Sequence, residues 1–397
     1  MVSNVSQLKS FAYSKNKTAG KRQSGVFFKP EQVWISKEVA DHPLTIQICE
    51  RLGDVPVDII DDSKFIKRPR ELSDAKRQLM ISRNFGEAFK SCQGIGEGHV
   101  CCKYKVIDLI SGCPMDCSYC ILQSYLANNP ITTIYVNLEE IFQNISIFLK
   151  QHSDSFFRIG TGELSDSLAL DDITDYSKLL IHFFSTRRNA LLELKTKTDR
   201  IDHLLDLPHR NRTVLAWSVN PQNIISHEER FTATLEERLI AAKKAVSAGY
   251  MVAFHFDPII VAHGNKQEID AYKDVIDKIL NAVEPKHIAW MSFGMLRYPP
   301  DLKNIAMRRF PKSHIFTGEL IPSGPKVRYL RFLREEVLSS LWNHAVKHIP
   351  KHKLYLCMET PLVWKKVDPS ITDDDSLECR LTRSESVKFD YKSSYKL

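Results

Sequence analysis

The segment Cys113-Pro114-Met115-Asp116-Cys117-Ser118-Tyr119-Cys120 places three cysteines close together, in the spacing C-x3-C-x2-C. An apolar stretch, Val106-Ile107-Asp108-Leu109-Ile110, leads directly into it. Thiolates this close in sequence can converge on one metal centre once the backbone wraps around it. A closed structural zinc site uses four protein ligands, whereas a cubane iron–sulfur cluster held by three thiolates leaves one iron open. The segment therefore predicts an iron–sulfur cluster whose open iron can bind a small molecule.

Zinc is the main alternative for these cysteines, because thiolate sites select zinc as well as iron–sulfur clusters. The fourth zinc ligand would then be a distant residue such as His99 or Cys102. A disulfide is disfavoured, since the chain shows no signal peptide and a reducing compartment opposes disulfide formation. A second group, Cys92, Cys101 and Cys102 with His99, surrounds a glycine-rich loop. That group is read either as a second metal site or as incidental thiols.

The composition indicates one large domain with additional segments, or two domains. The chain has 397 residues, 43% of them hydrophobic, and 55 Lys and Arg against 48 Asp and Glu, a net charge of +7. This mildly basic balance permits a nucleic-acid partner without requiring one, because phosphate binding needs a clustered patch. No apolar run approaches the ~18 residues of a membrane span. We therefore expect a soluble, cytoplasmic protein without a membrane partner.

The chain divides into segments of different character, which we interpret as domains. The start is polar and basic, with no acidic residue before Glu31, as in a disordered tail or a nucleic-acid-binding arm. A small mixed region follows, in which Lys67-Arg68-Pro69-Arg70 adds positive charge. The predicted divisions are a basic tail at 1–25, a small N-terminal region at 26–100, a partial barrel at 101–300, a C-terminal extension with a long helix and a final strand at 301–367, and a polar tail at 368–397.

From Tyr104 onward, apolar runs alternate with amphipathic helical patterns, which favours an α/β fold with a parallel sheet. Thr234 with Glu237, and Asn137 with Glu140, have the spacing of capping boxes that open helices. Six strand–helix steps are expected after residue 103, with strands near 104–110, 156–159, 190–197, 214–220, 250–260 and 288–296. A long helix near 326–347 and a last strand at 353–358 should follow. In a barrel of this kind the chemistry gathers at the carboxyl ends of the strands.

The cysteine spacing, with an aromatic residue just before the last cysteine, resembles the cluster loop of radical S-adenosylmethionine (SAM) enzymes. That resemblance implies an incomplete (β/α)6 barrel with the cluster loop after its first strand. It implies a [4Fe-4S] cluster whose open iron binds SAM through the amino and carboxylate groups. One electron, from a flavodoxin- or ferredoxin-type donor, then cleaves SAM to methionine and a 5'-deoxyadenosyl radical.

Within this superfamily, the stretch from Cys113 to about Trp364 resembles the spore photoproduct lyases. Leu122-Gln123 follows the cluster, and Ile134-Tyr135-Val136-Asn137-Leu138-Glu139-Glu140-Ile141 is similar to the "VYVNLEEI" segment of that family. The order and spacing of further local patterns agree as well: Thr196-Lys197 with Ile201-Asp202-His203-Leu204-Leu205-Asp206, Ser218-Val219-Asn220, Arg238 to Tyr250, and Phe254 to Ile259.

The resemblance implies roles for individual residues. Cys113, Cys117 and Cys120 would hold the cluster, and Tyr119 would lie against the SAM adenosine. The other implied SAM contacts are Ser165 and Asp166 at the methionine end, Lys197 on the carboxylate, Ser218 through a hydrogen bond, and Asp257 on the fifth strand. Gly160-Thr161-Gly162-Glu163 resembles the glycine-rich loop in which the backbone approaches SAM and an acid accepts from its amino group. This makes Gly162 and Glu163 cofactor-binding residues, and Glu163 and Tyr119 the candidate catalytic residues.

Two departures separate the chain from the repair enzymes of that family. Where they carry a cysteine that returns a hydrogen atom to the product radical, this chain has Glu163, whose O–H bond is too strong to serve. Where they carry a second tyrosine after the last cluster cysteine, this chain has Ile121. Their basic, aromatic hairpin is here shortened to Pro325-Lys326-Val327-Arg328-Tyr329.

Three functions are therefore compared. The first is a radical SAM, lyase-like enzyme that abstracts hydrogen from an unidentified substrate, with a nucleic acid as the candidate. The second is a genuine DNA photoproduct lyase that repairs thymine dimers with a hydrogen donor elsewhere in the chain, Cys101 or Cys102 being conceivable. The third is a non-catalytic zinc or iron–sulfur protein that binds nucleic acid.

Overall fold

The main sheet contains the six strands that the sequence predicts after residue 103, side by side and parallel. The computed structural model describes residues 28–61, 71–94, 98–262 and 264–382. In the described part, the sheet order is β18-β14-β13-β11-β10-β9-β5-β4, with only β4 antiparallel to its neighbour. The bounds are β4 (Phe89–Ser91), β5 (Lys105–Ile107), β9 (Phe157–Gly160), β10 (Ala190–Thr196), β11 (Thr213–Ser218), β13 (Met251–Ile259), β14 (Ile288–Met295) and β18 (Leu354–Leu356).

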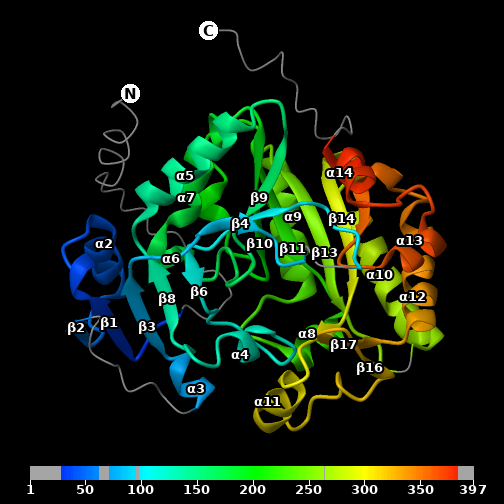
Figure 1. Ribbon diagram of the computed structural model, residues 1–397, viewed down its shortest axis with the longest axis horizontal. Helices are drawn as coiled ribbons and strands as arrows, with labels where there is room; N and C mark the ends of the chain where they lie inside the picture. Colours follow the sequence, from blue (N-terminus) through cyan, green and yellow to red (C-terminus); the bar gives the residue numbers. More distant parts are fainter. Residues whose placement is uncertain (1–27, 62–70, 95–97, 263, 383–397) are drawn as a thin grey trace.

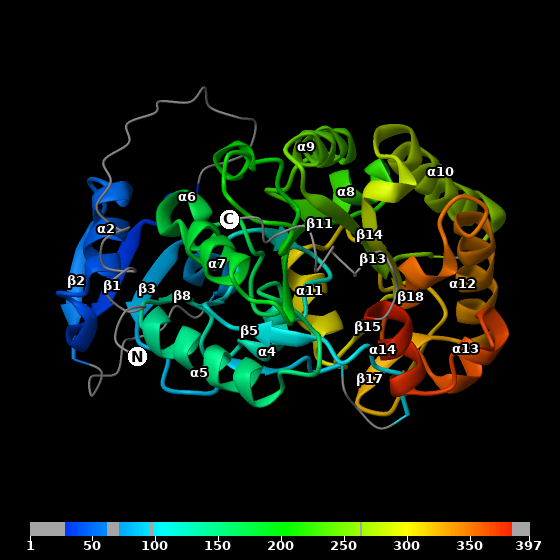
Figure 2. The same ribbon diagram turned by 90° about the horizontal axis from the view of Figure 1, so that it is seen from above.

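This sheet curls into a partial barrel, and helices cover its outer side (Figure 2). The covering helices include α7 (Tyr176–Ser185), α9 (Leu235–Ser247), α10 (Lys266–Ala282) and α12 (Arg331–Ala345). Thr234 forms the expected capping box with Glu237 at the start of α9. The capping box predicted for α5 (Leu138–Gln151) is wrong, because the side-chain amide oxygen (Oδ1) of Asn137 accepts instead from the backbone N–H of Asn84 at 2.8 Å.

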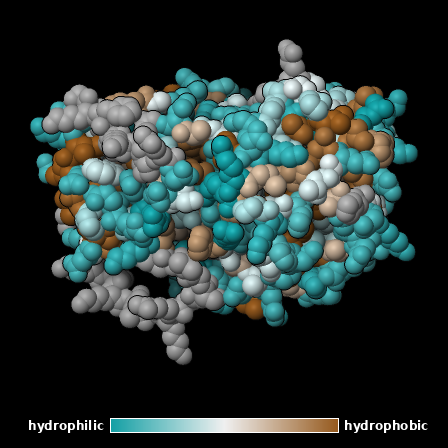
Figure 3. Space-filling view, turned by 90° about the horizontal axis from the view of Figure 1, so that it is seen from below, coloured by the Kyte–Doolittle hydropathy of each residue, from teal (hydrophilic) through white to brown (hydrophobic). Residues whose placement is uncertain are grey.

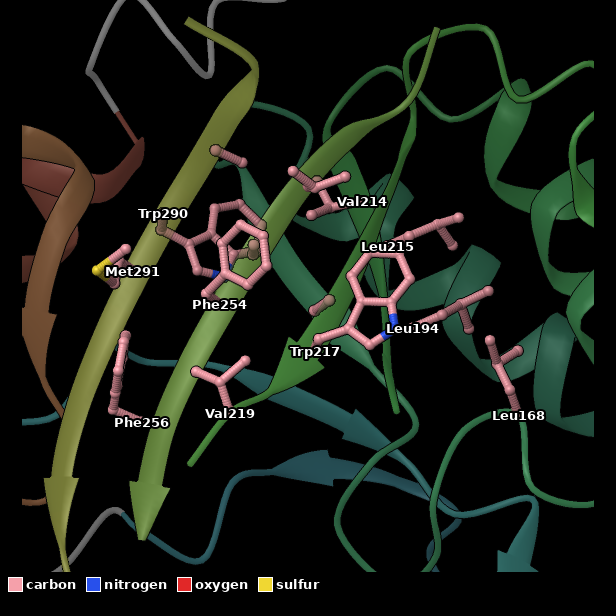
Figure 4. Close-up of a cluster of buried hydrophobic side chains, with 14 of the residues drawn as sticks. Leu168, Leu194, Val214, Leu215, Trp217, Val219, Phe254, Phe256, Trp290 and Met291 are labelled. Carbon is pink, nitrogen blue, oxygen red and sulfur yellow. The ribbon is translucent and has the colours of Figure 1, made fainter. Parts of the chain in front are cut away.

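The core lies between the outer face of the sheet and these helices. Trp217 of β11 and Phe254 of β13 are paired in register and fully buried there. Figure 4 shows them with Leu194 and Leu215 in the same apolar cluster. Burying one such side chain stabilises the folded state by about 1.5–3 kcal/mol. The apolar layer therefore holds the strands in register. The strand register in turn places the polar residues at the strand ends.

A second sheet stands at the other end of the molecule, in the order β2-β1-β3-β8-β6. It joins β1 (Gln32–Ser36), β2 (Val57–Ile60) and β3 (Gln78–Ser82) to β6 (Ile110–Ser111) and β8 (Thr132–Tyr135). The apolar segment near Ile134 thus pairs with β3 and lies outside the barrel sheet. Conversely, β4 precedes residue 100 and belongs to the barrel sheet. Both sheets therefore draw strands from each side of residue 100, and the proposed domain division stays a prediction.

The edge strand β2 leaves apolar side chains on the surface. Val57 is 45% exposed and Ile59 is 61% exposed. Figure 3 shows hydrophobic surface at the end of the molecule where β1, β2 and α2 (Pro43–Leu52) lie.

The C-terminal extension differs in part from its prediction. Lys326–Tyr329 is a strand, β17, rather than the start of a helix, and it pairs with β16 (Leu320–Ser323) and β15 (Arg297–Tyr298). The long helix α12 therefore begins only at Arg331. Within the segment expected to be a polar tail, α14 (Asp374–Thr382) is helical, and Leu377 and Leu381 are buried.

The expected basic tail, Lys67-Arg68-Pro69-Arg70 and residues 383–397 lie outside the described residues. Short elements complete the chain: α3 (Leu72–Ala75), β7 (Asp116–Cys117), α4 (Leu122–Tyr125), α6 (Asp171–Thr174), α8 (Gln222–Glu228), β12 (Glu229–Arg230), α11 (Leu302–Arg309) and α13 (Pro361–Val367), placed as Figure 1 shows. Among the described helices, none has the length and apolarity that a membrane crossing needs.

Candidate functional site

The cysteine loop is fastened to the chain that follows α8. Its strand β7 pairs antiparallel with β12, which places Cys117 opposite Glu229. The backbone N–H of Ser118 donates to the carbonyl of Glu228 at 2.9 Å, and the Ser118 hydroxyl donates to the Glu228 carboxylate. These contacts join two segments more than a hundred residues apart, so the loop has a fixed shape before any cofactor binds.

Two basic side chains, Lys76 and Arg309, bind the cysteine loop through hydrogen bonds and ion pairs. The Lys76 ammonium donates to the carbonyl of Cys113 at 3.2 Å and lies 3.1 Å from the Asp116 carboxylate. The Arg309 guanidinium donates to both Asp116 oxygens, at 2.8 and 3.0 Å. Burial alone would raise the pKa of Asp116, but Lys76 and Arg309 hold it below its ordinary value. Gln123 completes the support by donating to the carbonyls of Cys117 and Ser118.

The three thiols of the loop lie near one another. Cys113, Cys117 and Cys120 lie close enough to interact electrostatically. Burial raises the pKa of Cys113 to about 11 and raises that of Cys117 as well. Among the described residues, no three His, Cys, Asp or Glu side chains converge as they would around one metal ion.

Asp166 organises the end of β10 next to this loop. Its carboxylate accepts from the Thr196 hydroxyl at 2.7 Å and from the backbone N–H of Lys197 at 2.7 Å. Asp166 is thus held in place by the protein, and its contact with the methionine end of SAM stays a prediction. The neighbouring Ser165 is 7% exposed, and its hydroxyl has no hydrogen-bond partner in the described part of the chain.

Lys197 extends from the end of β10 toward the cysteine loop. Burial alone would lower its pKa, but Cys117, Glu229 and Asp166 raise it above the ordinary value. No hydrogen bond or ion pair joins its ammonium to the described residues. A half-buried ammonium of this kind is suited to an external carboxylate.

Tyr119 is held by a buried network behind the loop. Its hydroxyl donates to Glu229 at 2.5 Å, and Glu229 accepts from Asn220 at 2.9 Å and forms a 2.6 Å ion pair with Arg238. Burial alone would raise the pKa of Glu229, but Arg238 and Lys197 lower it to about 2. Arg238 also donates to the carbonyl of Ser218 at 2.8 Å, which ties the end of β11 to the same network.

Glu163 and Gly162 follow β9 and face the inside of the barrel. A Cβ at Gly162 would lie 3.1 Å from Cε of Lys195, so this glycine makes room for that side chain. One Glu163 oxygen accepts from the backbone of Gln93 at 3.3 Å, and the other is buried without a partner in the described part. Burial raises the pKa of Glu163.

Positive charge gathers in the barrel lumen. Asp257 forms an ion pair with Arg297 at 3.0 Å, and this lowers the Asp257 pKa although burial alone would raise it. Asp257 is therefore bound by the protein. Lys195 and Lys326 lie near it, and neither ammonium pairs with a described residue. Burial and the neighbouring Arg297 lower the pKa of Lys326. We call Lys195, Arg297 and Lys326 the lumen cations.

A buried polar network closes the base of the lumen. Glu193 accepts from Trp290 at 2.9 Å and lies 2.5 Å from His255. Arg158 donates to Tyr355 at 3.1 Å and stacks over Trp290, 4.3 Å from the ring centroid. Burial would raise the pKa of Glu193, but His255 and Arg158 lower it to about 2. We call these five residues the barrel floor.

The structure thus brings together most of the residues singled out from the sequence. Cys113 interacts electrostatically with Asp166, and Lys197 with both Cys117 and Asp166, while Ser165 precedes Asp166 in the chain. Asp257 and Glu163 lie further along the lumen, near Lys195. His99 lies instead beside Arg328, which donates to it at 2.6 Å. The sequence patterns did not single out the site roles of Lys76, Glu229, Arg297 and Arg309. Each is far in sequence from the motif residue that it contacts, so no local pattern marks it. Arg238 does stand within a quoted motif, but its pairing with Glu229 was not predicted.

The residues present fit a bound SAM on two counts. The unpartnered Lys197 ammonium suits a carboxylate. The unpartnered oxygens of Ser165 and Glu163 can accept hydrogen bonds from an ammonium. The methionine part of SAM carries both a carboxylate and an ammonium group.

Comparisons with known proteins agree on one family. A family model described as "Spore photoproduct lyase" matches residues 28–332. The chain is 27% identical over 302 residues to the spore photoproduct lyase of Geobacillus sp. (strain Y412MC61), covering 74% of this chain and 86% of the relative. It is 25% identical over 303 residues to that of Bacillus subtilis (strain 168), covering 74% and 85%.

Solved structures show the same fold. A spore photoproduct lyase variant with bound AdoMet and dinucleoside spore photoproduct superimposes with a TM-score of 0.73 at 24% identity, covering 84% of this chain and 100% of that one. A second, complexed with dinucleoside spore photoproduct, gives a TM-score of 0.73 at 23% identity, covering 83% and 99%. The chain therefore belongs to the spore photoproduct lyase family, whose members are radical SAM enzymes that use a [4Fe-4S] cluster and S-adenosylmethionine.

Proposed function

We propose that Cys113, Cys117 and Cys120 hold the cluster, that SAM lies between them and Lys197, and that the substrate is a nucleic-acid fragment held over the lumen cations. The observation that carries the proposal is the unpartnered Lys197 ammonium beside Cys117. When bound, the cluster and SAM supply a 5'-deoxyadenosyl radical that removes a hydrogen atom from the substrate.

The protein's own contribution is to bind and orient. Lys197 neutralises the carboxylate of SAM, while Ser165 and Glu163 accept from its amino group. Asp166 acts as a positioning residue, because it fixes the backbone of Lys197 and the Thr196 side chain. The Glu229–Arg238 pair binds both Tyr119 and the Ser218 backbone, and so positions these two residues next to the proposed SAM site. A flavodoxin- or ferredoxin-type protein is the proposed electron donor.

The lumen cations support an anionic substrate. Lys195 and Lys326 have no described partner, so a phosphate would replace water around charges that are already half-buried. The short β16–β17 hairpin brings Lys326 and Arg328 to the lumen edge, where the sequence suggested a reduced DNA-contacting hairpin. The relatives named spore photoproduct lyase include structures with a dinucleoside spore photoproduct. A nucleic acid carrying a thymine lesion is thus the first substrate to test.

The decisive experiment is anaerobic. The protein is reconstituted with iron and sulfide, reduced with dithionite and given SAM with a spore-type thymine dimer, either as a dinucleotide with its phosphate or as a dinucleoside without it. We expect 5'-deoxyadenosine with both and tighter binding of the dinucleotide. Protein that takes up zinc in place of iron and does not bind SAM would refute the proposal. If SAM is cleaved but the dinucleotide and the dinucleoside bind equally well, only the proposal that the substrate is a nucleic acid is refuted.

Repair of the dimer to thymidine would support the second candidate, a genuine photoproduct lyase. A specific observation favours testing it. Gln93, the residue after Cys92, donates its backbone N–H to Glu163, so a thiol-bearing segment contacts the residue at which this chain departs from the repair enzymes.

A further inference from the structure

Four cysteines from separate parts of the chain meet beside the lumen. Cys92 follows β4, Cys101 and Cys102 precede β5, and Cys357 follows β18. Cys92 interacts electrostatically with Cys102, and Cys357 interacts with both of them. Val100 and Glu359 form a β-bridge that draws these segments together. The sequence grouped the first three of these cysteines but not Cys357.

Three of the four thiols are engaged with other groups. Cys101 and Cys102 hydrogen-bond to each other. Cys357 hydrogen-bonds to Asp257, and its sulfur accepts from Arg297 at 3.6 Å. Cys92 differs: its sulfur accepts from the backbone N–H of Gly94 at 3.3 Å, and its S–H donates to no acceptor in the described part of the chain.

The chain segment that carries Cys92 is hydrogen-bonded to Glu163. The residue after Cys92, Gln93, donates its backbone N–H to the Glu163 carboxylate at 3.3 Å. The Cys92 thiol interacts electrostatically with both Glu163 and Lys195. Gly94 packs against Met358, whose sulfur accepts from Arg297 at 3.0 Å. The residues that follow Cys92 thus connect it to Glu163 through Gln93 and to Arg297 through Gly94 and Met358, and its thiol interacts electrostatically with Lys195.

From this placement we propose that Cys92 is a catalytic residue that donates a hydrogen atom to the substrate radical in the lumen. The assignment rests on the proposed function above, because it requires that a substrate radical forms there. In the step, the S–H bond of Cys92 breaks and a C–H bond forms on the substrate carbon, and the unpaired electron passes to sulfur. No proton or charge is exchanged with solvent.

The chemistry favours sulfur over the neighbouring carboxyl group. An S–H bond is weaker than the C–H bond formed, so the transfer runs downhill, whereas the O–H bond of Glu163 is too strong. The donor must also carry its hydrogen at neutral pH. Burial raises the pKa of Cys92, which keeps it a thiol rather than a thiolate.

The thiyl radical left on Cys92 must return to a thiol before the next turnover. One electron and one proton restore it. The one-electron reductant that supplies the cluster, dithionite in the experiment below, belongs to a chemical class that can provide that electron, and the proton comes from water. The thiol of Cys102, which interacts electrostatically with that of Cys92, can meanwhile give its hydrogen atom to the Cys92 sulfur, so that its own S–H bond breaks, the S–H bond of Cys92 forms again and the radical moves to Cys102.

The test uses the full chain with its cluster, dithionite, SAM and the spore-type thymine dinucleotide. In the Cys92→Ala and Cys92→Ser variants, 5'-deoxyadenosine should still form, while the ratio of thymine product to 5'-deoxyadenosine falls by roughly tenfold or more. Cys379→Ala, at an exposed cysteine, is the matched control and should keep the ratio of the unaltered protein. Adding Glu163→Cys to Cys92→Ala should restore the ratio, because it places an S–H bond at the neighbouring position.

A second readout does not depend on turnover. In the protein without iron, the dinucleotide should slow alkylation of Cys92 by iodoacetamide severalfold, with Cys379 as the unprotected reference. A Cys92→Ala variant with an unchanged product ratio, or equal alkylation of Cys92 with and without dinucleotide, would overturn the assignment. Absence of 5'-deoxyadenosine from the unaltered protein would instead count against the proposed function.

Discussion

Lys197 is the residue on which the proposed SAM site most depends, because its ammonium is the uncompensated charge nearest the cysteine loop. The Lys197→Met variant keeps the length of the side chain but loses the charge. A charged hydrogen bond contributes about 1.5–3 kcal/mol, so SAM affinity should fall by about 10- to 150-fold. Equilibrium dialysis with radiolabelled SAM measures this. Lys303→Met, on the exposed face of α11, is the control, and equal affinities in the two variants would contradict the role.

His99 gives a pH-dependent prediction. Burial and the neighbouring Arg328 lower its pKa to about 4 in the folded protein, against about 6.5 when unfolded. The unfolded chain therefore takes up a proton first as the pH falls, and the folded state loses stability between about pH 6.5 and pH 4. The melting temperature of the unaltered protein should fall more steeply over this window than that of His99→Gln. Parallel curves for the two proteins would show that His99 titrates normally.

Residue identities in the site were predictable where a short motif carried them, as for the three cysteines, Glu163 and Lys197. Their partners were not. Asp257 was predicted from its motif, but its ion-pair partner Arg297 lies forty residues away in the chain and belongs to no motif. Asp166 likewise binds the backbone that follows β10. A sequence names the polar residue at a strand end, but only the fold decides whether another side chain already satisfies it.

At the scale of elements, the cysteine loop depends on α11 as much as on the strand before it. Arg309 closes this helix and holds Asp116. In Arg309→Ala the buried Asp116 keeps only Lys76, and losing such a bond costs about 1–3 kcal/mol. We expect iron content after reconstitution to fall and release of iron to a chelator to accelerate.

The adjacent Arg308→Ala variant serves as the control for that prediction, because Arg308 is exposed on the same helix. Iron and sulfide analysis, with circular dichroism to check folding, separates the two variants. Equal iron retention in both would mean that Lys76 and β12 suffice to hold the loop.

The six strands were predictable because each contains an apolar run, and amphipathic helices separate several of them. Two elements were not. Lys326–Tyr329 was assigned to a helix because its residues continue the apolar stripe of α12, but pairing with β16 made it a strand. The segment after Val367 reads as polar, yet Leu377 and Leu381 are enough to anchor α14. In both cases a tertiary contact outweighed the local pattern.

At the scale of the whole molecule, the two sheets exchange strands, so we expect them to unfold together. Ile35 of β1 is 4% exposed in the second sheet, and Ile35→Ala should cost about 2–5 kcal/mol. Calorimetry should show one transition that shifts as a whole to lower temperature. Ile59→Ala, at a residue 61% exposed on β2, should shift it little. A separate early transition in Ile35→Ala would mean that the second sheet is an independent unit.

The barrel floor has a kinetic consequence. Arg158, Glu193 and Trp290 fill the base of the lumen, and the Val100–Glu359 bridge ties together the segments at its side. The lumen is therefore filled by side chains on the side where these residues lie. In the proposed site, where SAM and the substrate share the remaining space, the molecule in the deeper position has to arrive first and depart last. Turnover should follow a compulsory order, and a dead-end analogue of the later arrival should trap the earlier one inside.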